Sequence, residues 1–142
     1  MPVLFEKLIK TEAVDRSQAR NRFSRKGVYV FYEDLKPTYV GRSQNIPNRV
    51  LNHGRPSSGH NSATFAFLLA KEKAQKFGIS LKQTRNLLER DPDFREFYLE
   101  AKKRVAKMKI KAVEIKDHEI QAIFGIYASK KFKTKYNDFA TH

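Results

Sequence analysis

The sequence predicts an α+β protein, an α/β sandwich in which helices flank a small, mainly antiparallel sheet of three strands. Two short runs rich in β-branched and aromatic residues, at 27–32 and 38–41, stand on either side of a turn. A third strand-like run follows much later, at 108–115, and segments of helical periodicity surround all three. With 142 residues, the chain is expected to form one domain, 1–142.

The first 26 residues predict a helix and a connector. Leu4, Phe5, Leu8 and Ile9 recur at helical spacing, so a short leading helix is expected. The segment 15–26 is polar and basic, which is typical of a connection.

The next two runs predict a β-hairpin with a turn at 33–37. Side chains alternate between the two faces of a sheet, so Tyr29 and Tyr39 share a face only if the loop holds an odd number of residues. A three-residue loop at 33–35 would set the two rings opposite each other.

Helix-start and helix-stop residues mark the following segments. Asn45 is expected to cap a helix that runs to about His53. A second helix is expected to begin near Asn61 or Ser62 and to end at Gly78. Two further starts follow, the capping-box spacing of Ser80 with Gln83 and the pair Asp91-Pro92.

The last third of the chain predicts a strand and a helix. The apolar alternation of 108–115 slips between Ala112 and Val113, which indicates a β-bulge. A helix is expected after Asp117. Its predicted buried face is the apolar stripe of Ile120, Ile123, Phe124 and Tyr127.

Charge and composition narrow the class of partner. Lys and Arg number 29 against 15 acidic residues, a formal net charge of +14, which favours a polyanion such as nucleic acid over a membrane surface. No apolar run is long enough to span a bilayer, and the first ten residues lack a signal-peptide pattern. The absence of cysteine excludes disulfides and thiolate metal sites, and points to the cytoplasm.

The tripeptides Gly27-Val28-Tyr29 and Tyr39-Val40-Gly41, followed by a helix with Arg49 and His53 one turn apart, are similar to the core of the GIY-YIG nuclease family. The resemblance covers 27–77 and 108–137, and leaves 79–107 as a helical insertion before the third strand. It implies a metal-dependent endonuclease that acts on double-stranded DNA as a monomer or homodimer. Gly125-Ile126-Tyr127 matches the family's first tripeptide letter for letter, but this is a coincidence, because it lies in the last predicted helix and no Tyr-x-Gly follows it.

The resemblance also implies roles for the side chains. Tyr29 would take a proton from the attacking water and Tyr39 would position the water or the phosphate, although single tyrosines are ordinary strand residues. Arg49 would bind the phosphate through its two-pronged guanidinium, and His53 would orient Tyr29 or contact the phosphate. The expected substrate contacts are Arg42, His60 and Asn137.

Glu119 is the expected metal ligand, for Mg²⁺ or Mn²⁺. Mg²⁺ tolerates a site with one protein carboxylate because it keeps several waters. Glu114 and Asp117 are alternatives, but Asp117 is better explained as a helix cap.

The insertion and the activity each leave an alternative open. Cations interleaved with Phe94, Phe97 and Tyr98 suit the tracking of a nucleic-acid strand, and the same aromatic residues suit the packing face of a helix, which we favour. The alternatives to a DNA endonuclease are a non-catalytic nucleic-acid-binding module and a nuclease that acts on RNA.

Overall fold

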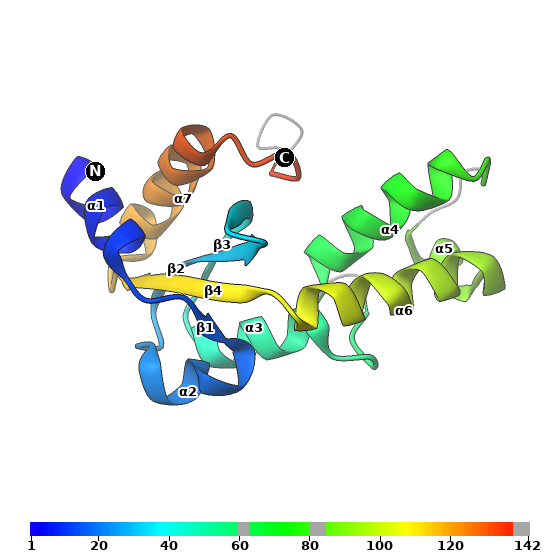
Figure 1. Ribbon diagram of the computed structural model, residues 1–142, viewed down its shortest axis with the longest axis horizontal. Helices are drawn as coiled ribbons and strands as arrows, with labels where there is room; N and C mark the ends of the chain where they lie inside the picture. The colour runs from blue at the N-terminus through cyan, green and yellow to red at the C-terminus, as the bar shows by residue number, and fades with distance from the viewer. Residues whose placement is uncertain (60–62, 80–84, 138–142) are drawn as a thin grey trace. The chain divides into compact units, whose positions relative to one another are not determined.

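A computed structural model describes residues 1–59, 63–79 and 85–137. The chain divides into two compact units, one formed by 1–50 with 108–142 and the other by 51–107. The first unit holds the sheet and the second is helical (Figure 1). Each unit is described by itself below.

The sheet has four strands rather than the predicted three: β1 (Val14–Asp15), β2 (Gly27–Glu33), β3 (Lys36–Ser43) and β4 (Lys109–Glu114). Their order is β1-β4-β2-β3, and all neighbours are antiparallel. The α+β class is therefore confirmed and the strand number was wrong. The extra strand β1 has two residues, too few for any alternation to appear in the sequence.

Helices cover both faces of this sheet. Helix α1 (Pro2–Lys10), predicted from its periodicity, and α7 (His118–Phe132) lie above the sheet in Figure 1, whereas α2 (Ala19–Arg22) and the start of α3 (Ile46–Gly54) lie below it. A short 3₁₀-helix, Arg16–Gln18, precedes α2. The segment predicted as a plain connector thus contains two short helical pieces and the last residue of β1.

The core under α1 and α7 is formed by one face of the sheet. Its buried residues come from three strands, from these two helices and from the position directly after β4: Leu8, Val28, Val30, Val40, Val113, Ile115, Phe124 and Ala128. The opposite face carries the odd-numbered residues of β2, among them Tyr29 and Phe31, which are also buried. Because both faces are covered, Ala112 and Val113 are both buried in an unbroken register, and the predicted bulge there was wrong.

The buried face of α7 differs from the predicted stripe. Of the four stripe residues, Phe124 lies in the core and Tyr127 packs against it, but Ile120 and Ile123 are exposed, as is Ile126 outside the stripe. The residues that face the protein interior are instead Gln121, Phe124, Gly125, Ala128 and Ser129. Two polar residues and a glycine interrupt this face, so its periodicity cannot be seen from apolar residues alone.

The second unit contains α4 (Thr64–Lys76), α5 (Arg85–Arg90) and α6 (Pro92–Ala106), together with the end of α3. Helices α4 and α6 pack through aromatic rings, with the Phe67 centroid 5.2 Å from that of Phe94 and 5.5 Å from that of Tyr98. Phe94 and Tyr98 are buried, which confirms the packing interpretation of these two residues in the insertion.

Most predicted helix ends are confirmed. Asp91 caps α6 by accepting from the amides of Asp93 and Phe94, and Asp117 caps α7 by accepting from Ile120. Gly78 follows α4 with a φ of 81°. The starts predicted at Asn61, Ser62 and Ser80 fall outside the described residues. Among the helices of the described ranges, none has the length and apolar character needed to cross a membrane.

Candidate active site

The hairpin places Tyr29 and Tyr39 on the same face of the sheet, but by another route than predicted. Its turn has two residues, Asp34 and Leu35, with φ values of 51° and 68°. An even loop would send the two phenols to opposite faces. A bulge at Thr38 corrects the parity, because Tyr32 pairs with Pro37 while Phe31 pairs with Tyr39.

The bulge is held by a hydrogen bond from the Thr38 hydroxyl to the Phe31 carbonyl, 2.9 Å long. Beyond it, Tyr29 pairs with Gly41. The two tyrosines are thus diagonal neighbours rather than directly opposite.

Gly41 makes room for the Tyr29 ring. A Cβ built on Gly41 would overlap the phenol oxygen and the ring carbon that carries it. The glycine of the second tripeptide therefore has a steric role: the phenol of the first tripeptide lies over it. The ring of Phe31 contacts Tyr29 edge-on, with centroids 5.7 Å apart, and holds it from the side.

Helix α3 brings Arg49 to the two phenols. Asn45 caps this helix by accepting from the Asn48 amide at 3.3 Å, and the Ser43 hydroxyl oxygen accepts from the Asn45 amide at 2.9 Å. One turn along, the Arg49 side chain hydrogen-bonds Tyr29, and its charge also acts on Tyr39. Tyr29, Tyr39 and Arg49, called the phenol–arginine cluster below, therefore lie together as predicted.

Burial sets the protonation state of this cluster. Tyr29 is 1% exposed, and desolvation raises its pKa well above the ordinary value for tyrosine. The neighbouring Tyr39 raises the pKa of Tyr29 further, whereas Arg49 lowers it without reversing the balance. Burial likewise raises the pKa of Tyr39. Both phenols carry their protons at neutral pH, so a phenolate base is not the resting state.

The two predicted histidines have different positions. His53 lies on α3 one turn after Arg49 and is fully buried. His60 lies outside the described residues.

Arg42 lies on the other face of the sheet, because it pairs with Val28 of the core. Its guanidinium is 3.4 Å from Nδ1 of His118, the first residue of α7. Gln44 joins the same group by donating to Gln121 at 3.0 Å, and Gln121 in turn donates to the Ile115 carbonyl at 2.7 Å. Sequence reasoning missed His118, Gln44 and Gln121, because they are polar residues without a motif that meet only through long-range contacts.

Glu119 is not brought to the phenol–arginine cluster by any contact that the structure gives. It is exposed in the first turn of α7, a helix that covers the opposite face of the sheet. Within the described ranges no three His, Cys, Asp or Glu residues lie close enough together to hold a metal ion. Glu114 is exposed at the end of β4 and Asp117 is the α7 cap. Glu119, the predicted ligand, therefore lies over the sheet face opposite to the phenols.

Asn137 fastens the C-terminal segment to β3. Its amide nitrogen donates to the Val40 carbonyl, and its amide oxygen accepts from the Val40 amide, both at 2.8 Å. The Thr134 hydroxyl donates to the same oxygen at 2.9 Å. Asn137 thus extends the edge of the sheet beside Tyr39, which agrees with a tie between the tail and the site.

Comparison of the chain with protein-family models, curated proteins and solved structures finds no match. The candidate site is defined by the residues and contacts of this chain alone.

Replacing Gly41 by alanine should destabilise the protein by about 1–3 kcal/mol, because the new methyl group must displace the Tyr29 phenol. Urea unfolding measures the effect. Gly125→Ala in α7 is the matched control: its Cβ meets nothing within 4 Å, and alanine should stabilise the helix by about 0.5–1 kcal/mol. Equal stability of Gly41→Ala and the wild type would contradict the packing of Tyr29 over Gly41.

The raised pKa of Tyr29 predicts a loss of stability in alkali. Unfolded tyrosine ionises near pH ~10, whereas folded Tyr29 stays protonated, so the free energy of unfolding falls by roughly 1.4 kcal/mol per pH unit for this group above that point. Urea unfolding from neutral pH to pH ~11 should therefore show a shallower decline for Tyr29→Phe. Val30→Ala, a core change in the same strand, should lower stability with the wild-type slope.

Loss of the Asn137 tie should open the edge of β3. Asn137→Ala removes both bonds to Val40, so exchange of the Val40 amide with deuterium should accelerate about fivefold, for a bond worth about 1 kcal/mol. Asn137→Asp keeps the acceptor and should protect this amide better. Unchanged exchange in Asn137→Ala would show that the tail does not hold the strand.

Proposed function

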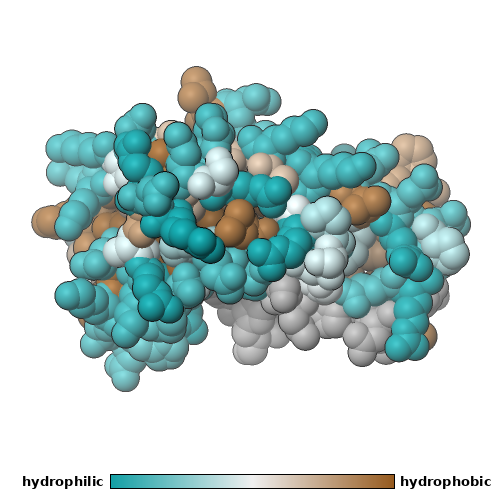
Figure 2. All heavy atoms as spheres, turned by 90° about the horizontal axis from the view of Figure 1, so that it is seen from below, coloured by the Kyte–Doolittle hydropathy of each residue, from teal (hydrophilic) through white to brown (hydrophobic). Residues whose placement is uncertain are grey.

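We propose that this protein is an endonuclease that hydrolyses phosphodiester bonds in nucleic acid, with double-stranded DNA as the expected substrate. The observation that supports the proposal best is the phenol–arginine cluster, in which two strands and a helix direct Tyr29, Tyr39 and Arg49 toward one another. The net charge of +14 suits a polyanionic substrate, and hydrophilic side chains cover most of the face seen in Figure 2.

Arg49 is the residue that would hold the scissile phosphate. A guanidinium binds two phosphate oxygens at once and stabilises the negative charge that grows on them as the water attacks. The bond to Tyr29 fixes the direction of the Arg49 side chain before substrate arrives. Such preorganisation makes the charge available without rearrangement in the transition state.

The phenols would handle the proton of the attacking water. Water adds to the phosphorus, the bond to the 3′ oxygen breaks, and the products carry 5′-phosphate and 3′-hydroxyl ends. Because both phenols are protonated, the consistent role is a relay, in which a phenol oxygen accepts the proton of the water while its own proton passes toward the departing oxygen. The relay leaves the tyrosine unchanged.

A divalent ion, Mg²⁺ or Mn²⁺, stays a prediction from the family resemblance. Glu119 lies on the helix over the opposite sheet face, so the proposed step uses only the phenols and Arg49. The same position of Glu119, together with the protonated state of Tyr29, favours a second candidate: a nucleic-acid-binding module that does not cut. In that case Arg49 and its neighbours would bind phosphates without chemistry.

A plasmid-nicking assay separates the two candidates. Wild type should nick supercoiled plasmid in the presence of Mg²⁺, and Arg49→Lys should nick about 100-fold more slowly, because lysine cannot replace the two-pronged contact. Arg20→Lys, on an exposed arginine of α2, is the matched control and should cut like wild type. Structured RNA in a parallel reaction tests the alternative substrate.

Retained plasmid binding without nicking by the wild type would establish the non-catalytic module. Equal rates of nicking by Arg49→Lys and the wild type would show that Arg49 does not bind the scissile phosphate. Glu119→Ala should nick at the wild-type rate, because Glu119 lies over the sheet face opposite to the phenols. A loss of nicking in this variant would instead support Glu119 as the metal ligand that the family resemblance implies.

A further inference from the structure

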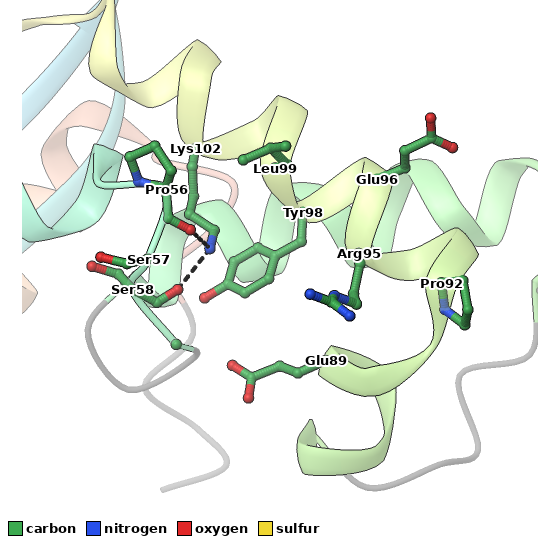
Figure 3. A pocket seen from close by; sticks show the side chains of 11 residues that line it. Pro56, Ser57, Ser58, Glu89, Pro92, Arg95, Glu96, Tyr98, Leu99 and Lys102 are labelled. Atoms are coloured by element: carbon green, nitrogen blue, oxygen red, sulfur yellow. Dashed lines mark hydrogen bonds between the residues drawn. The ribbon is translucent and has the colours of Figure 1, made fainter.

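The helical unit 51–107 contains a pocket of about 550 Å³ that the phenol–arginine cluster does not use. Helix α6 forms one wall, and the end of α5 and the loop 56–59 form the rest (Figure 3). A volume of this size suits a small organic ligand. The residues that the argument uses are Pro56, Glu89, Pro92, Arg95, Tyr98 and Lys102.

Lys102 has a structural role in the pocket. It is 6% exposed, and its ammonium donates to the carbonyls of Pro56 at 2.8 Å and Ser58 at 2.7 Å. The same nitrogen lies 3.9 Å from the centroid of the Tyr98 ring, a cation–π distance. Two of the three ammonium donors of Lys102 are used by these carbonyls, and its charge lies over the Tyr98 ring. Lys102 therefore fixes the loop and the tyrosine, and leaves ligand binding to other groups.

Tyr98 offers the pocket a hydroxyl in need of a partner. Its ring is held by Lys102 and by Phe67 and Phe94, with centroids 5.5 Å and 6.1 Å away. The side chain is 4% exposed, and within the described residues its hydroxyl has no hydrogen-bond partner. A buried hydroxyl without a partner destabilises the protein, and a ligand that accepts its hydrogen bond would remove that cost. Burial raises the pKa of Tyr98, so the hydroxyl remains a donor.

Glu89 and Arg95 supply charges of opposite sign. In Figure 3 the guanidinium of Arg95 points toward the space between Tyr98 and the carboxylate of Glu89. Glu89 lies close to the loop, because a Cβ on Gly59 would be 3.2 Å from its Oε1. The pocket therefore presents a carboxylate acceptor beside two donors, with Pro56, Pro92 and Leu99 as apolar walls.

We propose that this pocket binds an unpaired or flipped-out nucleobase, with guanine as the best fit. Guanine carries two adjacent N–H donors, on N1 and N2, which match a carboxylate, and the O6 acceptor beside them matches Tyr98 or Arg95. Uracil and adenine lack such a pair of donors next to an acceptor. The proposal rests on the proposed function, because it takes nucleic acid as the partner.

Calorimetric titration of the full chain with mononucleotides tests the pocket without any cleavage. GMP should bind at least about tenfold more tightly than AMP or UMP, the discrimination that one good two-bond contact gives. Glu89→Gln should weaken GMP binding at least about tenfold, and Tyr98→Phe should weaken it while keeping the ring. Glu100→Gln, on α6 but paired with Lys73 away from the pocket, is the matched control and should bind like wild type.

Failure to bind any mononucleotide would overturn the proposal, and so would equal affinity for inorganic phosphate and GMP, or wild-type affinity in Glu89→Gln. Circular dichroism of each variant checks that it is folded. Measuring plasmid nicking by the same preparations distinguishes a failure of the pocket proposal from a failure of the proposed hydrolase activity. A protein that nicks plasmid and ignores GMP contradicts the pocket alone, whereas one that binds GMP and never nicks contradicts the hydrolase alone.

Discussion

The candidate site depends on one close approach, that of the Tyr29 phenol to the backbone of Gly41. Because no side chain stands at Gly41, the ring can lie across β3, and there its oxygen reaches Arg49. The same packing removes the phenol from water and raises its pKa. Geometry and protonation state therefore have one cause. A buried, protonated tyrosine in this position can orient an arginine and relay a proton, but it is not a phenolate at neutral pH.

The features that depend on local chemistry could be predicted from the sequence. Asn45, Asp91 and Asp117 cap the helices they were expected to cap, and two tyrosines on adjacent strands reach one face with Arg49. The details that failed depend on tertiary contacts. Strand β1 exists only because Val14 can pair with Ile110, almost a hundred positions away. The two-residue turn and the bulge at Thr38 could not be seen in the composition of the loop.

The position of Glu119 shows that the order of motif residues along the chain does not predict which side chains meet in the fold. A carboxylate near the start of a helix has the expected position in the chain, but the buried face of α7 was not its apolar stripe. Gln121 and Gly125 face the protein interior while three isoleucines face out. The rotation of a helix about its axis is decided by such contacts, and it also decides whether a neighbouring carboxylate can meet the site. The charge of Lys102 is likewise used for packing, which its sequence context did not reveal.

The most direct test of the central claim is the rate at which purified wild type and Tyr29→Phe nick supercoiled plasmid with Mg²⁺ present. Phenylalanine keeps the ring over Gly41 and removes only the oxygen that contacts Arg49. A phenol that relays the proton and orients the arginine predicts nicking by the wild type and a rate at least about 100-fold lower in the variant. Nicking by Tyr29→Phe at the wild-type rate would contradict the account.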